Sequence, residues 1–439
     1  MKKTILIISS LIFGLGMSSC DSYLDIEPEG KVIPETQEDF RALLTQGYVA
    51  YPGHKALTAL RTDEVQLDKE SLDYLDLRDI YIWKDQGQDK QTVEFPWSSF
   101  YNSIFYSNHS IAEGSLVLPD SPEKDQLIGE AYALRAFAFF DLVNLYAKPY
   151  NPSTSNTDRA IPLALEIDLE NVLEPETTQR VYDQIHEDIN RAKELLQVEV
   201  QEVGYNYRFS KAAIYTLEAR VNLYQQNWEA ALESVSKAMQ YKNQLEDLNN
   251  IDFVPTHYLS TESILALETP FSSSLKRSSM ASEELIDAYD QDNDLRFDVY
   301  FEDDGEHYKV IKVGEIETKV SMRTAELYFI KAEAEARLNG LADAKNTLQE
   351  IIIRRYLPDA SDTIISEMAQ LDQDEFIEFL LEERFKEFAL EGHRWFDLRR
   401  VNQKEIIHVV DGVEHILQEN DPRYSLPYPT NARLNNPNL

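Results

Sequence analysis

Apolar residues recur at helical spacing along most of the chain, and the strongest pattern runs from about Gln126 to Tyr146. One stripe steps by three and four residues and consists of Leu127, Ala131, Leu134, Ala138, Leu142 and Leu145. A second stripe at the same spacing consists of Tyr132, Ala136, Phe139, Val143 and Tyr146. Because neither face can meet water cheaply, the pattern predicts a helix enclosed by other helices. Lys148-Pro149 should end it, since proline disfavours helix in the residue before it.

Two later segments repeat one plan of helix, short polar turn and helix. The first runs from Ile214 to Met239 and turns at Gln226-Asn227, and the second runs from Leu327 to Arg354 and turns at Asn339-Gly340. Their agreement in turn position and small residues predicts an all-α fold of tetratricopeptide-like helical hairpin repeats. The alternative is an irregular helical protein whose hairpins are alike by chance.

Shorter patterns predict the remaining elements. Further helices are expected at Glu38–Leu44, Trp97–Asn108 and Val181–Leu196. A few short strands are expected at Ser263–Leu267, Tyr308–Val313, Ile406–Val410 and Val413–Leu417, with tight turns at Asp304-Gly305 and Asp411-Gly412. The segments near 50–96 and 250–320 lack long helical patterns and are expected to form an irregular half.

Composition narrows the possible partners. The chain has 439 residues, 43% of them hydrophobic, with 42 basic and 78 acidic side chains and a formal net charge of −36. Such a chain repels nucleic acid and anionic lipid headgroups, and no basic patch reverses that.

The N-terminus has the pattern of an export signal. Lys2-Lys3 precede an apolar run from Ile5 to Leu15, and small residues then lead to Cys20. This arrangement predicts a lipoprotein signal peptide at residues 1–19, with Cys20 acylated as the new N-terminus. Since Cys20 is the only cysteine, a lipid anchor explains it better than redox chemistry, although a cleaved secretory signal beside a free thiol is the alternative. No later stretch is apolar for the ~20 residues of a membrane span.

Six stretches together resemble the SusD/RagB family of outer-membrane lipoproteins, from Cys20 to Leu439 and in the family's order. They read YLDIEPEG, WSSFYNSIFYSN, EAYALRAFAFFDLVNLYAKPY, MRTAELYFIKAEAEARLNG, LLEERFKEFALEGHRWFDLRR and SLPYPTNARLNNPNL. The resemblance implies one SusD-like domain over residues 20–439, in which hairpin repeats carry an irregular ligand-binding half.

The resemblance also implies a function. Members of this family sit on the cell surface, anchored to the outer membrane by lipid, and cap a TonB-dependent transporter of the SusC type. Their cargo is most often an oligosaccharide or polysaccharide, and some relatives carry peptides, so a RagB-like peptide-binding protein is the alternative. The chain departs from the family in the short segment between Glu268 and Val320, where many relatives have insertions.

The irregular segment from Arg61 to Trp97 is the predicted ligand-binding region. Sugars stack their C–H faces on aromatic rings and hydrogen-bond to polar side chains, and this segment offers both kinds of group. The candidates, with two tyrosines expected to face the segment, are Asp73, Tyr74, Arg78, Tyr81, Trp83, Tyr300 and Tyr308. The alternative is that Tyr81 and Trp83 are core residues. For Trp97 a core role is preferred, since it shares a helix face with Phe100, Tyr101 and Ile104.

No catalytic, metal or cofactor site is predicted. A glycoside hydrolase would need two positioned carboxylates, and with 78 acidic residues a pair proves nothing. The polar cluster from Glu382 to Arg399 alternates carboxylates with arginines, which indicates a buried ion-pair network tying two helices. The eight histidines show no zinc-site spacing, and phosphate-binding loops and nucleophile elbows are absent from the sequence. A tetratricopeptide adaptor that binds only protein remains a third reading of the helices.

Overall fold

The computed structural model describes residues 34–168 and 171–439. The predicted signal peptide, Cys20 and the YLDIEPEG motif therefore lie outside the described residues. Within the described part, no helix combines the length and the apolarity that crossing a membrane requires.

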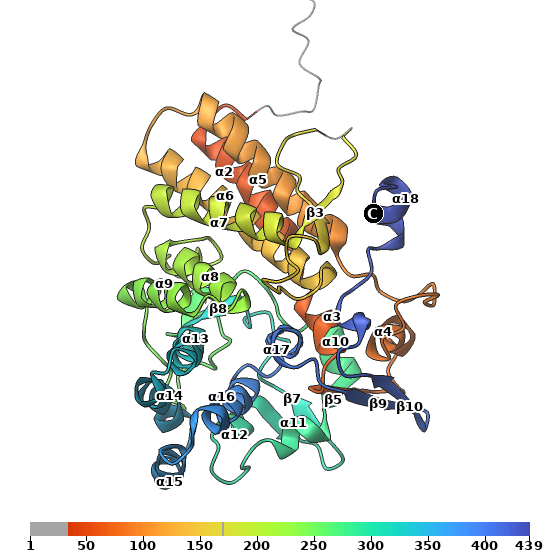
Figure 1. The fold of residues 1–439 in the computed structure, drawn as a ribbon, viewed down its shortest axis with the longest axis vertical. Coiled ribbons are helices and arrows are strands. Elements are labelled where there is room, and N and C mark those ends of the chain that lie inside the picture. Colours follow the sequence, from red (N-terminus) through yellow and green to blue (C-terminus); the bar gives the residue numbers. More distant parts are fainter. Residues whose placement is uncertain (1–33, 169–170) are drawn as a thin grey trace, which may run out of the picture.

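Long helices follow one another down one side of the molecule in chain order, from α2 and α5 at one end to α15 and α16 at the other (Figure 1). They are α2 (Gln37–Ala50), α5 (Trp97–Val117), α6 (Pro122–Tyr146), α7 (Thr178–Leu195), α8 (Lys211–Tyr224), α9 (Trp228–Tyr241), α13 (Thr324–Arg337), α14 (Leu341–Arg355), α15 (Pro358–Met368) and α16 (Gln373–Glu387). Consecutive helices pack in pairs, so the predicted all-α class is confirmed.

The helix α6 lies inside this stack, as its two apolar stripes predicted. Both stripes are buried apart from the partly exposed Tyr132. The helix begins four residues earlier than the pattern suggested, at Pro122, because the Ser121 hydroxyl accepts from the Lys124 N–H and caps it. Gly129 lets α7 approach, since a Cβ there would lie 3.0 Å from the Leu196 nitrogen.

The two predicted hairpins have the same local geometry. In each, the second residue after the first helix takes a left-handed conformation, with φ of 61° at Gln226 and 65° at Asn339. The next helix starts two residues later, at Trp228 and at Leu341. Identical turns at corresponding positions confirm the hairpin repeat.

Short elements make up the other side of the molecule and the connections. They are α3 (Lys55–Ala59), β1 (Val65–Leu67), α4 (Tyr74–Tyr81), β2 (Arg159–Pro162), β3 (Pro175–Thr177), β4 (Ser263–Leu265), α10 (Ser273–Ser278), β5 (Ser279–Ala281), α11 (Glu283–Asp287), α12 (Arg296–Tyr300), β6 (Phe301–Asp303), β7 (Tyr308–Val310), β8 (Met322–Arg323), α17 (Arg394–Val401), β9 (Ile406–Val410), β10 (Val413–Leu417), the 3₁₀ turn η2 (Pro422–Tyr424) and α18 (Thr430–Asn435). Among the described residues the strands pair only two by two, all antiparallel: β1-β5, β2-β3, β4-β8, β6-β7 and β9-β10.

Both predicted tight turns are present. Asp411 and Gly412 have φ of 53° and 76° between β9 and β10, and Gly305 has φ of 90° between β6 and β7. One local expectation is corrected, because residues 74–81 form the helix α4 where the sequence suggested an irregular loop.

A buried ion-pair network joins α16 to neighbouring segments, as the polar cluster from Glu382 to Arg399 indicated. Glu387 lies at its centre, 2.7 Å from Arg323 Nη1 and 2.9 Å from Arg355 Nε. Both arginines also bind Glu262, at 2.8 and 2.6 Å. Burial alone would raise the pKa of the Glu387 carboxyl, but the Arg355 and Arg323 guanidiniums hold it well below its usual range. The carboxylates are thus held in structural pairs.

Replacing Glu387 by Gln should destabilise the protein strongly, because it leaves buried guanidiniums without their counter-charge. We expect a loss of about 3–5 kcal/mol in the free energy of unfolding, measured by denaturant titration. The matched control is Glu350→Gln, which breaks the more exposed pair with Arg354 and should cost under about 1 kcal/mol. Equal losses in the two variants would contradict the structural role of the network.

Candidate functional site

Three of the predicted ligand-binding rings are buried. Tyr81, Trp83 and Tyr300 are 3%, 1% and 0% exposed. His408 lies between two of them, with ring centroids 3.9 Å from Tyr81 and 4.2 Å from Trp83. The Trp83 indole donates to the Arg61 carbonyl at 3.1 Å. The expectation that these rings face a ligand is therefore corrected: they pack in the core and offer no face to one.

The other four predicted residues are partly exposed, and each makes contacts within the protein. Tyr74 and Tyr308 pack on the same hydrophobic cluster as Tyr81 and Tyr300. Asp73 accepts from the Ser278 hydroxyl, and Arg78 pairs with Asp79 at 3.0 Å. The structure thus brings the four tyrosines to one cluster, and none of the seven residues lines the cavity described below.

Neighbouring polar residues of the predicted segment hold the chain together. Arg61 pairs with Asp85 at 2.7 Å, and Asp63 pairs with Arg394 at 2.5 Å. Glu64 is fully buried and accepts from the Leu390 N–H at 2.7 Å. Burial raises the pKa of the Glu64 carboxyl to about 7.

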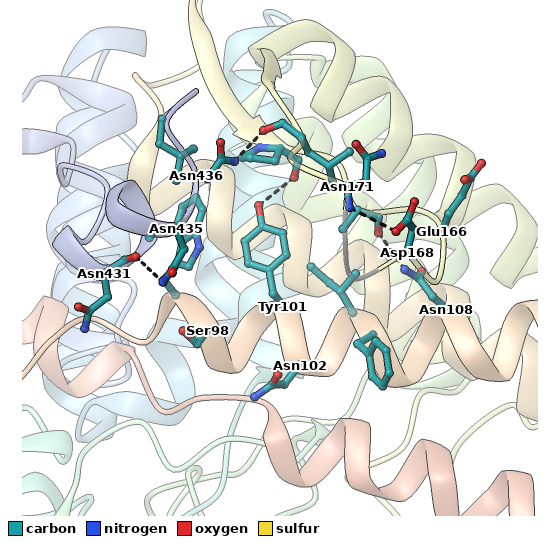
Figure 2. Close-up of a pocket in the computed structure, with 18 residues that line it drawn as sticks. Ser98, Tyr101, Asn102, Asn108, Glu166, Asp168, Asn171, Asn431, Asn435 and Asn436 are labelled. Carbon is teal, nitrogen blue, oxygen red and sulfur yellow. Dashed lines mark hydrogen bonds between the residues drawn. The ribbon is translucent and has the colours of Figure 1, made fainter. Parts of the chain in front are cut away.

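A cavity of about 520 Å³ opens between α5, the segment that connects β2 to β3, and α18. Figure 2 shows α5 running along one side, with the asparagines of α18 at one end and Glu166 and Asp168 at the other. The three walls come from segments far apart in the sequence. The cavity lies within the size range of ligand pockets, roughly 300–1,000 Å³.

Aromatic rings of α5 form an apolar stripe in this cavity. Trp97, Tyr101 and Phe105 follow one another at four-residue spacing, which places them on one helix face, and all three are half-buried. The Tyr101 hydroxyl donates to the Pro162 carbonyl at 2.8 Å and fixes its ring (Figure 2). Trp97 packs against Tyr146 and Tyr428, with centroids 4.8 and 5.6 Å away. Trp97 thus packs against the core, as predicted, but its ring also lines the cavity.

Amide and carboxylate side chains surround the stripe. Those that line the cavity are Asn102, Asn108, Asn171, Asn431, Asn435, Asn436, Glu166 and Asp168. Asn108 is held by Arg135, which donates to its oxygen at 2.9 Å, while its own amide donates to the Ala164 carbonyl at 2.9 Å. Asn102 is exposed on α5 beside the rings. Amide groups both donate and accept, which suits them to hydroxyl groups.

The segment around α18 closes the cavity through a few polar contacts. The Tyr428 hydroxyl donates to the Ala160 carbonyl, and the Asn436 amide donates to the Leu173 carbonyl at 2.7 Å. No residue of α18 itself is buried. This wall therefore shapes the cavity without contributing to the core.

This site was not predicted from the sequence, although two of its three walls lie in motifs named above. The stripe lies in WSSFYNSIFYSN and the amides of α18 lie in SLPYPTNARLNNPNL. The four-residue spacing of the aromatic rings and the density of asparagine in the tail were the available signals.

Comparisons with known proteins agree with the fold. Residues 22–223 match a family profile described as starch-binding associating with outer membrane, and residues 303–439 match the SusD family profile. The chain belongs to the SusD family. A SusD-like protein of Formosa agariphila is 26% identical over 94% of each chain.

Solved structures of SusD proteins have the same fold. A SusD superfamily protein from Bacteroides thetaiotaomicron gives a TM-score of 0.77 at 19% identity, covering 92% of this chain and 98% of that one. One from Bacteroides fragilis gives 0.76 at 23% identity, covering 93% and 100%. A laminarin-binding SusD-like protein gives 0.63 at 18% identity, covering 83% and 91%.

Stability should fall as the pH rises through the pKa of Glu64. A carboxyl whose pKa is raised from its ordinary 4.5 to about 7 holds its proton in the folded state between these values, so the folded state is favoured at the acid end. Its contribution should decline by up to about 3 kcal/mol between pH 4.5 and pH 7. Glu64→Gln, which keeps the shape without the charge, should therefore be more stable than wild type at pH 8 and similar to it at pH 5.

Denaturant unfolding at both pH values measures this difference. The control is Glu70→Gln, an exposed residue of the same segment, which should follow the wild-type pH dependence. A Glu64→Gln protein that is equally destabilised at pH 5 and pH 8 would rule out the buried neutral carboxyl.

Proposed function

We propose that this SusD-family protein captures an uncharged oligosaccharide or polysaccharide in the cavity between α5 and α18. It delivers this ligand to a SusC-like TonB-dependent transporter, and acylated Cys20 anchors it to the outer surface of the outer membrane. Binding without catalysis is the activity. Family membership supports the surface role, and the cavity supports the class of ligand.

The observation that carries the proposal is the stripe of Trp97, Tyr101 and Phe105 facing a row of amides. Pyranose rings present flat C–H faces to aromatic rings and hydroxyl groups around their edge. Rings at four-residue spacing on a helix stand about 6 Å apart along its axis, on the scale of one sugar residue. A chain of sugars lying along α5 would therefore meet rings and amides in succession.

The charge of the cavity favours an uncharged ligand. Among the described residues that line it, the only charged ones are Glu166 and Asp168, both acidic. The whole chain carries a formal net charge of −36. Uronate or sulfated glycans would be repelled both at long range and at the site. The similarity to a laminarin-binding SusD-like protein agrees with a glycan ligand.

Calorimetric titration of residues 21–439 tests the proposal directly. The panel pairs uncharged glycans such as laminarin with uronate and sulfated glycans and with peptides, and chromatography checks each mixture for cleavage. We expect binding of an uncharged glycan without new products. Preference for peptides or anionic glycans would contradict the ligand class, and cleavage would contradict a binding role without catalysis.

Replacing Phe105 by Ala should weaken glycan binding about five- to tenfold, because one ring of the stripe is lost. This corresponds to roughly 1 kcal/mol of aromatic contact. The matched control is Phe253→Ala, a ring 38% exposed outside this cavity, which should bind as wild type does. Equal affinities of the two variants for the glycan would remove α5 from the site.

Deleting residues 430–439 should abolish the α18 wall while leaving the fold intact. Because α18 buries none of its residues, the melting temperature should change little. Glycan affinity should fall at least tenfold with the loss of Asn431, Asn435 and Asn436. Unchanged affinity in a folded deletion variant would place the ligand elsewhere.

A further inference from the structure

A second polar cluster lies in the interior, away from the cavity at α5. It consists of His54, just before α3, Asp141, on α6, and Glu268, shortly after β4. The three side chains are 0%, 4% and 3% exposed, and one ligand atom from each lies within 4.8 Å of the others. No spacing along the chain reveals this set, since each member comes from a different segment.

The cluster contains polar atoms that the described protein leaves unsatisfied. Among the described residues, three atoms of the cluster have no hydrogen-bond partner: both ring nitrogens of His54 and Oε1 of Glu268. His54 Nε2 is 3.5 Å from Asp141 Oδ2, and Nδ1 is 3.8 Å from Glu268 Oε1, too far for good hydrogen bonds. Buried polar groups nearly always have partners, so these atoms indicate a missing one.

The surrounding contacts engage only some of the polar atoms in the cluster. Tyr51 donates its hydroxyl to Asp141 at 2.5 Å, and Lys55 donates to the other oxygen of Glu268, Oε2, at 2.8 Å. The nearby Arg220 forms an ion pair with Glu326 instead: its Nε and Nη2 donate to the two carboxylate oxygens at 2.6 and 2.7 Å. Among these described residues, the two carboxylates thus share one further cation, Lys55, which pairs with Glu268. The excess negative charge in a buried place favours a bound cation.

We propose that His54, Asp141 and Glu268 bind one divalent transition-metal ion of the Zn²⁺ or Mn²⁺ class. An imidazole nitrogen with two carboxylate oxygens is a ligand set of this class, whereas Ca²⁺ takes oxygen ligands only. Bonds of about 2.1 Å in a tetrahedral site place ligand atoms roughly 3.4 Å apart. His54 Nε2 and Asp141 Oδ2 are 3.5 Å apart, whereas the three ligand atoms lie within 4.8 Å of one another, so Glu268 would turn inward when the metal binds. The metal would tie α6 to the segments that carry His54 and Glu268.

The site borders a surface cavity. Glu268 and Tyr51 also line a surface cavity of about 740 Å³, whose other walls include Tyr48, Tyr207 and Tyr258. An ion could enter through this cavity, and three protein ligands leave a coordination position for water or for a hydroxyl group of a molecule bound there.

Metal analysis of the untagged protein tests this inference, because an affinity tag would itself bind zinc. After chelator treatment and dialysis, ZnCl₂, MnCl₂ and CaCl₂ are each titrated by calorimetry, and bound metal is counted by mass spectrometry. We expect one Zn²⁺ or Mn²⁺ per chain with micromolar or tighter affinity, and a higher melting temperature when it is bound. His54→Gln, which removes no hydrogen bond, should fold and bind at least 100-fold more weakly.

The matched control is His109→Gln, because His109 forms a surface pair with Glu113 at 3.3 Å. It should bind metal as wild type does. No stoichiometric binding by wild type, preference for Ca²⁺, or loss in His109→Gln with retention in His54→Gln would each overturn the proposal. X-ray absorption at the metal edge on wild type adds a test that needs no variant: one imidazole among oxygen ligands is expected, and an all-oxygen shell contradicts it.

Discussion

The burial of α6 on all sides is the constraint on which the rest of the structure depends. A helix of 25 residues that is apolar round most of its circumference has to be covered by other helices. Two of its buried charged residues form ion pairs with neighbouring helices of the stack. Glu130 forms an ion pair with Arg41 of α2 at 2.6 Å, and Arg135 forms one with Asp188 of α7 at 2.6 Å. These pairs fix which helices cover α6 and how they are turned.

The covering of α6 also determines where ligands can bind. Since α5 packs one face on α6 and α2, its remaining face turns Trp97, Tyr101 and Phe105 toward the cavity with α18. The helix α6 itself carries Asp141, one of the residues of the proposed metal site. At the end of the helical stack formed by the later helices, the ion pairs of Glu387 hold α16 to β8 and α14. Rigid helices thus position side chains that stand on short and irregular segments.

Much of the scaffold could be predicted because its causes are local in the sequence. The stripes of α6 and the paired turns at Gln226 and Asn339 depend on periodicity and on a few turn residues. The ion-pair network around Glu387 is predictable for a similar reason, since arginines alternate with carboxylates in that stretch of sequence. Residues 74–81 differ, because their amphipathic pattern is too short to predict the helix α4 from the sequence.

The ligand site was harder to predict because it depends on contacts between distant segments. Trp83 has a side chain of the type that stacks on sugars, but the ring of His408, far along the chain, covers it. Asn431 and Asn435 belong to a polar tail whose place only the fold reveals: Tyr428 fastens the tail to β2, and Asn436 fastens it to the segment between β2 and β3. The histidines showed no metal spacing because His54, Asp141 and Glu268 meet only in three dimensions.

The central claim is that a glycan lies along α5, and a crystal structure with the best-binding oligosaccharide from the titration panel tests it most directly. The account predicts sugar density between α5 and α18, with rings stacked on Trp97, Tyr101 or Phe105 and hydroxyl groups on the amides of α18. Density confined to the surface around Asp73, Tyr74 and Tyr308, with the cavity at α5 left to water, would contradict it.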